Sequence, residues 1–145
     1  MRGGRTFVVD SSVVLKWRLP EADSALAESL LEKVLFAPDL LLAECANAFW
    51  KLVRRGDIAA ADAVTALADL RKAPINLMRD GDLVEDAQHL SLSLDHPIYD
   101  CLYLALGMRC GVPVVTADER FARRVEQRPD LAGAVVRLSS LPDLA

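Results

Sequence analysis

The sequence predicts an α/β protein with three layers, α/β/α, in which helices cover both faces of a central parallel sheet of four to five strands. Short apolar runs rich in β-branched residues alternate with longer segments whose apolar residues recur at helical spacing, a pattern typical of such a sheet. The chain has 145 residues, and 52% of them are hydrophobic, which suits one domain over residues 1–145 with a core of its own.

Each predicted strand is a short apolar run that ends at polar or turn residues. The first of them stops at Asp10-Ser11-Ser12, and the fourth stops just before Thr116. The predicted strands are Thr6–Val9, Val34–Ala37, Pro74–Met78, Val112–Val115 and Ala134–Leu138.

The predicted helices are delimited mainly by proline and glycine. Pro20 closes the first helix, Pro38 lies near the start of the third with Gly56 past its end, and Gly111 stops the sixth, as helix-terminus preferences lead one to expect. The predicted helices are Val13–Leu19, Glu21–Lys33, Pro38–Arg55, Ile58–Lys72, Gly81–Leu94, Tyr99–Cys110 and Asp118–Gln127.

Hydropathy argues against a membrane protein. No apolar stretch approaches the roughly 18 residues that a membrane-spanning helix needs, and the chain starts without the apolar core of a signal peptide. We therefore expect a cytoplasmic protein. Cys45, Cys101 and Cys110 form no CxxC pair, so we expect small core residues rather than a disulfide framework or a zinc site.

The charge balance limits the ways in which the chain could bind nucleic acid. It carries 17 Lys plus Arg against 21 Asp plus Glu, a formal net charge of -4. Domains that bind nucleic acid by bulk charge are usually basic. Any such binding must rest on local positive charge, or on a cation that offsets a cluster of acids.

Two predicted strands end at carboxylates. Asp10 follows the first strand directly, and Asp118 follows the fourth within Thr116-Ala117-Asp118. The ligand crevice of an open parallel sheet lies outside the carboxyl ends of its strands, so this edge is where chemistry is expected. Either acid could instead cap the helix after it. Their recurrence at two strands favours a functional role.

Two further acids lie in apolar helices. Glu44, Asn47 and Lys51 are the polar residues of the segment 40–51 and fall on one narrow stripe. That stripe faces either solvent or a site, but Glu44 lies where the helix is apolar nearly all round, and an acid near a core needs a partner or a metal. Asp100 begins another apolar helix, where the helix dipole alone could explain it.

Together the four acids indicate a chemistry. Carboxylates without a nearby CxxC or HExxH motif match the oxygen ligands that Mg²⁺, and also Mn²⁺, prefers. Such a cluster repels itself without a cation, so it should be metal-loaded or partly protonated. Mg²⁺ held by carboxylates generally acts on phosphate groups, where it activates water for an in-line displacement.

Four segments resemble those of PIN-domain ribonucleases and, among them, of the VapC-type toxins of bacterial and archaeal toxin–antitoxin pairs. The segments, in family order, are FVVDSSVVLKW, LLLAECANAFWKL, HPIYDCLYLALG and VVTADERFARR. The resemblance implies a PIN-like fold and a Mg²⁺-dependent endoribonuclease in which Asp10 and Asp100 are the principal ligands. It implies a site made of Asp10, Glu44, Asp100 and Asp118, supported by Ser12, Asn47 and Thr116.

The resemblance also implies partners. VapC-type toxins cleave RNA, are held inactive by a small antitoxin that docks over the site, and commonly form homodimers. Val13–Trp17 and Phe49–Val53 are candidate contact surfaces, although burial within one chain would explain both. Cys45, Cys101 and Gly107 depart from the residues that are usual in the family, which bears on local packing and not on the acids.

Basic residues follow one of the site acids. Arg120, Arg123 and Arg124 share a helical face beyond Asp118 and could hold the RNA backbone. An equally good interpretation is a solvated face on which these arginines pair with Glu119 and Glu126.

Other functions remain in competition. A non-catalytic RNA-binding or regulatory module that keeps the PIN fold is the main alternative. A phosphoacceptor domain or a haloacid-dehalogenase-like phosphatase is disfavoured because Asp10 is followed by Ser11 and Ser12, not by the acids that these need. A metal-free, two-histidine ribonuclease is also disfavoured, since His89 fits the polar face of a helix and His96 lies in a loop before a proline.

Overall fold

The computed structural model describes residues 5–144, so the predicted domain limits at residues 1 and 145 lie outside the described part of the chain. Its centre is a parallel sheet of five strands in the order β3-β2-β1-β4-β5. The strands are β1 (Thr6–Val9), β2 (Val34–Pro38), β3 (Ile75–Met78), β4 (Val114–Thr116) and β5 (Val135–Arg137).

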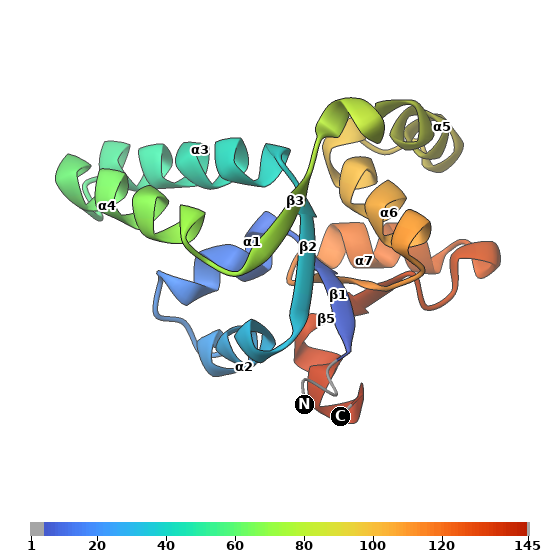
Figure 1. Cartoon of the computed structure of the whole chain (residues 1–145), viewed down its shortest axis with the longest axis horizontal. Coiled ribbons are helices and arrows are strands. Elements are labelled where there is room, and N and C mark those ends of the chain that lie inside the picture. Colours follow the sequence, from blue (N-terminus) through green and yellow to red (C-terminus); the bar gives the residue numbers. More distant parts are fainter. Residues whose placement is uncertain (1–4, 145) are drawn as a thin grey trace.

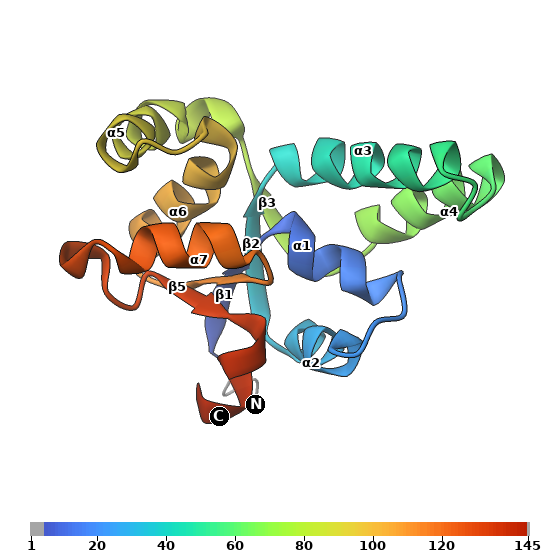
Figure 2. The ribbon, with the colours of Figure 1, turned by 180° about the vertical axis from the view of Figure 1, so that it is seen from behind.

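Helices cover both faces of this sheet, which confirms the predicted three-layer fold. Figures 1 and 2 show α1 to α4 on one side of the sheet and α5 to α7 on the other. The helices are α1 (Ser11–Val14), α2 (Ser24–Ser29), α3 (Leu40–Arg54), α4 (Ala60–Arg71), α5 (Val84–Leu94), α6 (Ile98–Cys110) and α7 (Glu119–Glu126).

The strand order reverses beside β1. The chain adds β2 and β3 on one side of β1, then returns to the other side and adds β4 and β5. Because crossovers between parallel strands are nearly always right-handed, the helices before and after this return cover opposite faces. The ligand crevice of such a sheet opens at the carboxyl ends of the strands where the order reverses, here β1 and β4.

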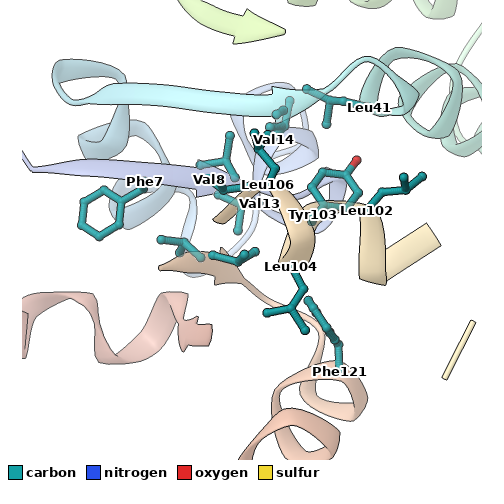
Figure 3. Close-up of a cluster of buried hydrophobic side chains, with 14 of the residues drawn as sticks. Phe7, Val8, Val13, Val14, Leu41, Leu102, Tyr103, Leu104, Leu106 and Phe121 are labelled. Carbon is teal, nitrogen blue, oxygen red and sulfur yellow. The ribbon is translucent and has the colours of Figure 1, made fainter. Parts of the chain in front are cut away.

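Helix α6 is the centre of the hydrophobic core. Every residue from Cys101 to Gly107 is buried, and the helix packs against β1, β2 and β4. Figure 3 shows its side chains among those of β1, α1 and α7. Gly107 permits the close approach to β4, because a Cβ there would lie 2.8 Å from the carbonyl oxygen of Val112, just before the strand, and 3.1 Å from Cγ2 of Val114. Asp100, in the first turn of α6, is thus placed by the core itself.

Several predicted boundaries were wrong for identifiable reasons. The first two predicted helices each break into a short α-helix and a 3₁₀ turn, Leu15–Trp17 after α1 and Leu30–Glu32 after α2. The fourth strand starts at Val114 rather than Val112. Val112 donates its N–H to Gly107 at the end of α6, and Pro113 has no N–H to donate.

One expectation about a single side chain is wrong, and burial within the chain accounts for part of one candidate contact surface. Cys45 and Cys101 are buried as predicted, but Cys110 is exposed, because burial of α6 ends at Gly107 and its last turn faces solvent. Val13 and Val14 belong to the core, and the indole of Trp17 donates to the carbonyl of Ala27 at 2.7 Å. The segment Val13–Trp17 is therefore largely a packing element of the monomer.

The helices also bear on the predicted absence of a membrane segment. Among residues 5–144, none of the helices has the length and apolar content needed to span a bilayer.

Candidate active site

Asp10 lies where β1 ends, and a network of hydroxyl groups holds it. Its side chain is almost fully buried, with 4% exposed. Oδ1 accepts from Ser12 Oγ at 2.5 Å and from the backbone N–H of Val13 at 3.2 Å, and Oδ2 accepts from Thr116 Oγ1. Burial raises its pKa to about 7, although these hydrogen bonds lower it and the charge of Asp100 raises it further.

The two hydroxyl groups join β1 to β4. Ser12 Oγ accepts from the backbone N–H of Ala117 at 2.9 Å, and Thr116 Oγ1 accepts from that of Asp118 at 3.0 Å. Each hydroxyl therefore accepts a hydrogen bond from a backbone N–H just after β4 and donates one to the carboxylate of Asp10. The sequence predicts supporting roles for Ser12 and Thr116, and these contacts are what such roles require.

Glu44 lies in the second turn of α3 and faces α6. The phenol of Tyr103, which is 1% exposed, donates to Glu44 Oε1 at 2.5 Å. Burial raises the pKa of Glu44, the hydrogen bond from Tyr103 lowers it, and the charges of Asp100 and Asp80 raise it. Asn47 is exposed on α3, and within residues 5–144 it takes no part in the hydrogen bonds around the four acids.

Asp100 lies in the first turn of α6, and Asp118 is the N-cap of α7. Nε2 of His96 lies 2.7 Å from Asp100 Oδ2. Burial raises the pKa of Asp100, His96 lowers it, and the charge of Asp118 raises it. Asp118 Oδ1 accepts from the backbone N–H groups of Arg120, at 2.9 Å, and Phe121, at 3.2 Å.

The structure thus brings the four predicted acids to one edge of the sheet, with Asp100 in the middle of them. Burial is the largest cause of each raised pKa, and the charge of Asp100 contributes at both Asp10 and Glu44. Acids that stay close and buried despite mutual repulsion need protons or a cation.

The donor set has the chemistry that a hard divalent cation needs, although among residues 5–144 its members are not arranged as a ready metal site. In the described chain, no three Asp, Glu, His or Cys side chains already form a group that could hold an ion. The hydrogen bonds described above occupy only one oxygen of Glu44, Asp100 and Asp118. Their second oxygens keep free lone pairs, and carboxylate oxygens are the ligands that Mg²⁺ and Mn²⁺ prefer.

Sequence reasoning missed residues that touch this site. Asp39 and Asp80 follow β2 and β3 and cap each other's segments, with the N–H of Asp80 donating to Asp39 and that of Leu40 donating to Asp80. The rule about strand ends that singled out Asp10 would have found both. The apolar pattern indicates an ordinary core residue at Tyr103, and the sequence brings His96 forward only in the disfavoured two-histidine interpretation, without a link to Asp100.

The predicted basic face borders the acids. An open groove of about 540 Å³ runs beside Asp100 and Asp118 and is lined on α7 by three arginines. Arg123 pairs with Glu119 at 3.4 Å, whereas Glu126 pairs with Arg137 on β5. Pairing with Glu119 and Glu126 thus accounts for one of the arginines only. Arg124 instead donates to the backbone carbonyl of Asp95 at 3.0 Å and lies 3.9 Å from its carboxylate. Those that line the groove are Arg120, Arg123 and Arg124.

Comparison with known proteins assigns the family. A family model for the PIN domain matches residues 7–126, a span that contains all four acids. The chain belongs to the PIN-domain family. Ribonuclease VapC3 of Pyrobaculum aerophilum is 30% identical over 121 residues, which cover 81% of this chain and 92% of that protein. The predicted resemblance to VapC-type PIN proteins is therefore confirmed.

Solved PIN structures share the fold. PAE2754 of Pyrobaculum aerophilum has a TM-score of 0.71 and 21% identity, over 94% of this chain and 85% of that one. Mycobacterium tuberculosis VapC20, described as a toxin that cleaves the sarcin–ricin loop, has a TM-score of 0.62 and 21% identity, over 81% and 93%. VapBC2 of Rickettsia felis, solved on a DNA fragment of its promoter, has a TM-score of 0.59 and 12% identity, over 92% and 98%.

Proposed function

We propose that this PIN protein is a Mg²⁺-dependent endoribonuclease, able to use Mn²⁺, and the toxin of a type II toxin–antitoxin pair. One observation carries the proposal. Four acids from four separate segments lie at the edge of the sheet where the strand order reverses, and the charge of Asp100 adds to burial in raising the pKa of Asp10 and of Glu44. The names of the VapC relatives supply the choice of RNA as substrate.

The same acids would hold the metal. Asp10 and Asp100 are the principal ligands in this proposal, and Glu44 and Asp118 complete the site directly or through water. When bound, Mg²⁺ supplies positive charge at a phosphate oxygen and lowers the pKa of a water molecule. Hydrolysis by water, rather than by the ribose 2′-hydroxyl, predicts products with a 5′-phosphate and a 3′-hydroxyl.

The chain's own residues fix this arrangement and handle protons. Ser12 and Thr116 hold both oxygens of Asp10, so that this buried carboxylate cannot rotate freely. Burial raises the pKa of Glu44, which makes its carboxylate a stronger base for a proton released at the site. Arg120 and Arg124, on the neighbouring groove, carry the local positive charge that an acidic protein needs to hold an RNA backbone.

An apolar groove of about 300 Å³ lies between α3 and α4 and is here named the α3–α4 groove. Trp50 is 53% exposed and Val64 is 73% exposed. The groove residues are Ala46, Phe49, Trp50, Val53, Ala60, Ala63, Val64 and Leu67.

We assign this groove to one segment of the antitoxin, as an anchor for the partner that the family resemblance places over the acids. Lys51 and Arg54 are exposed on the last turns of α3, and Arg54 lies over the Trp50 ring at 5.4 Å. Arg55 follows as the C-cap of the helix and pairs with Asp57 at 3.0 Å. A second copy would bring like charges together, whereas an amphipathic segment with acidic residues complements both the apolar floor and the basic rim. A homodimer, which the family also suggests, would then use another face.

Cleavage of RNA oligonucleotides by the purified protein tests the function. We expect cleavage with Mg²⁺ or Mn²⁺, none in EDTA, and a loss of at least about 10²-fold in Asp10→Asn and Asp100→Asn. Full cleavage in EDTA, or by either variant, would contradict the proposal. RNA binding that persists without metal-dependent cleavage of any RNA would instead favour the non-catalytic RNA-binding module.

A further inference from the structure

His96 touches the acidic site but has no part in the function proposed above. It lies in the turn between α5 and α6, and its side chain is 14% exposed. Nε2 lies 2.7 Å from Asp100 Oδ2. An ionised carboxylate can only accept hydrogen bonds, so the Nε2–H of His96 is the donor.

The imidazole of His96 is held independently of Asp100. It stacks on the ring of Phe121, with 5.6 Å between centroids and 23° between planes, and Phe121 is fully buried. Its backbone is fixed as well, because the His96 N–H donates to Ser91 O at 3.1 Å and the His96 carbonyl accepts from Ser91 Oγ at 2.6 Å. Because its ring and its backbone are both held in place, His96 can in turn fix the orientation of the Asp100 carboxylate.

The turn that delivers His96 contains an unusual backbone conformation. Asp95 has φ 51° and is the one non-glycine residue with positive φ among residues 5–144. Left-handed conformations cost a residue with a side chain about 1 kcal/mol. The turn reverses the chain after α5, so that His96 folds back onto Ser91 and reaches the first turn of α6.

We propose that His96 is a positioning residue that prepares Asp100 to bind the divalent cation. By donating to Oδ2 it fixes the carboxylate and leaves Oδ1, which is outside the hydrogen bonds of the described residues, as the oxygen for the metal. This inference rests on the proposed function. A carboxylate that is already oriented loses less freedom when it binds a metal, and removal of such an orienting partner typically weakens metal binding about 10–100-fold.

Binding of Mn²⁺ alone, without RNA, tests this role. His96→Phe keeps a ring to stack on Phe121 and removes the donor, and we expect it to raise the Kd for Mn²⁺ about 10–100-fold. His96→Gln carries an N–H at a reach similar to Nε2, and we expect a Kd within about three-fold of the unmodified protein. His89→Phe, at an exposed position on α5, is the matched control and should leave the Kd unchanged.

A comparison of His96→Asn with His96→Gln separates the positioning of Asp100 from the packing of the His96 side chain. His96→Asn carries the same amide as Gln on a shorter side chain that falls short of Oδ2, so it should bind Mn²⁺ as weakly as His96→Phe. Thermal unfolding in EDTA reports whether each variant is folded. If His96→Phe is destabilised, the difference in Mn²⁺ binding between His96→Asn and His96→Gln still tests whether His96 positions Asp100.

The outcomes distinguish this inference from the proposed function. Normal Mn²⁺ binding by His96→Phe and His96→Asn, with binding lost in Asp100→Asn, would overturn the role of His96 and leave the metal site intact. Equally weak binding by the Gln and Asn variants would also overturn it. Normal Mn²⁺ binding by Asp100→Asn would instead contradict the metal site itself.

Discussion

The acidic edge of the sheet and the α3–α4 groove are each unfavourable in the isolated chain, the first because it buries carboxylates and the second because it exposes apolar side chains. At the edge, burial raises the pKa of the carboxyls of Asp10, Glu44 and Asp100, whereas in the groove Trp50 and Val64 expose apolar surface. A bound cation would neutralise the buried carboxylates, and another protein chain would cover the exposed apolar surface.

Helix α3 joins the two regions. It carries Glu44 near its start, where it leaves the sheet, and Trp50 on the part that packs against α4. Figure 1 shows this pair of helices extending away from the sheet, whereas α6 lies along it. A small domain can thus keep its chemistry and the anchoring of a partner on separate surfaces, and substitutions in the groove should affect the anchoring without affecting the chemistry.

The largest effect should come from removing the buried charge of Asp10. Asp10→Asn should abolish metal-dependent cleavage and yet raise the free energy of unfolding of the metal-free protein at pH 7 by about 1–3 kcal/mol. The reason is that the amide keeps the shape of the side chain without a charge to bury. Chemical unfolding in EDTA measures the change. Asp62→Asn, at an exposed position on α4, should change neither property.

The pH dependence of stability follows from the same group. Burial raises the folded-state pKa of Asp10 to about 7 from an ordinary value of 3.8, so the folded state binds more protons than the unfolded state between these pH values. The free energy of unfolding of the metal-free protein should therefore fall as the pH rises from about 4 to about 7. A flat profile in the unmodified protein, or an equal slope in Asp10→Asn, would contradict this interpretation.

The next largest effect should come from Gly107→Ala, which tests the close approach of α6 to the sheet. Replacing a helical glycine by alanine normally stabilises, but the Cβ of Gly107→Ala would lie 2.8 Å from the carbonyl oxygen of Val112. We expect a loss of about 1–3 kcal/mol in the free energy of unfolding. Gly81→Ala, where no atom lies within 4 Å of the added Cβ, is the control and should be neutral or slightly stabilising. Equal effects at both positions would show that the close approach of α6 does not limit the core.

The fold and the four acids could be predicted because each depends on a local pattern. Strand ends locate Asp10 and Asp118, and helical spacing within apolar segments locates Glu44 and Asp100. His96 could not be found this way, because its role needs Phe121 from another helix and a left-handed turn at Asp95.

Two other parts of the site escaped sequence reasoning. The apolar pattern around Tyr103 predicts a core residue, which it is, and conceals the single hydroxyl that reaches Glu44 across the packing of two helices. The predicted helix Pro38–Arg55 includes Asp39 near its start, whereas the pairing of Asp39 with Asp80 depends on β2 and β3 being neighbours.

The groove should respond to substitution in the opposite way from the acidic edge. Trp50→Ser combined with Val64→Ser should leave RNA cleavage unchanged, and the free energy of unfolding should change by less than about 1 kcal/mol, because both side chains are largely exposed. Binding of the antitoxin should weaken at least about 10-fold, as expected when an aromatic anchor is lost. Calorimetric titration with the antitoxin measures this, and unchanged affinity would show that the partner covers another face.

The smallest effect concerns backbone strain beside the site. Asp95→Gly relieves the left-handed conformation at φ 51° and should raise the free energy of unfolding by about 0.5–1 kcal/mol, whereas Asp95→Ala should lower it by a similar amount. The weak contact with Arg124, 3.9 Å away, is lost in both variants, so the difference between Gly and Ala isolates the backbone. Equal stabilities in thermal unfolding would show that the turn carries no strain. A difference of the expected sign would show that the segment beside the acidic edge stores backbone strain as well as charge. The α3–α4 groove, in contrast, is set apart by its exposed apolar side chains.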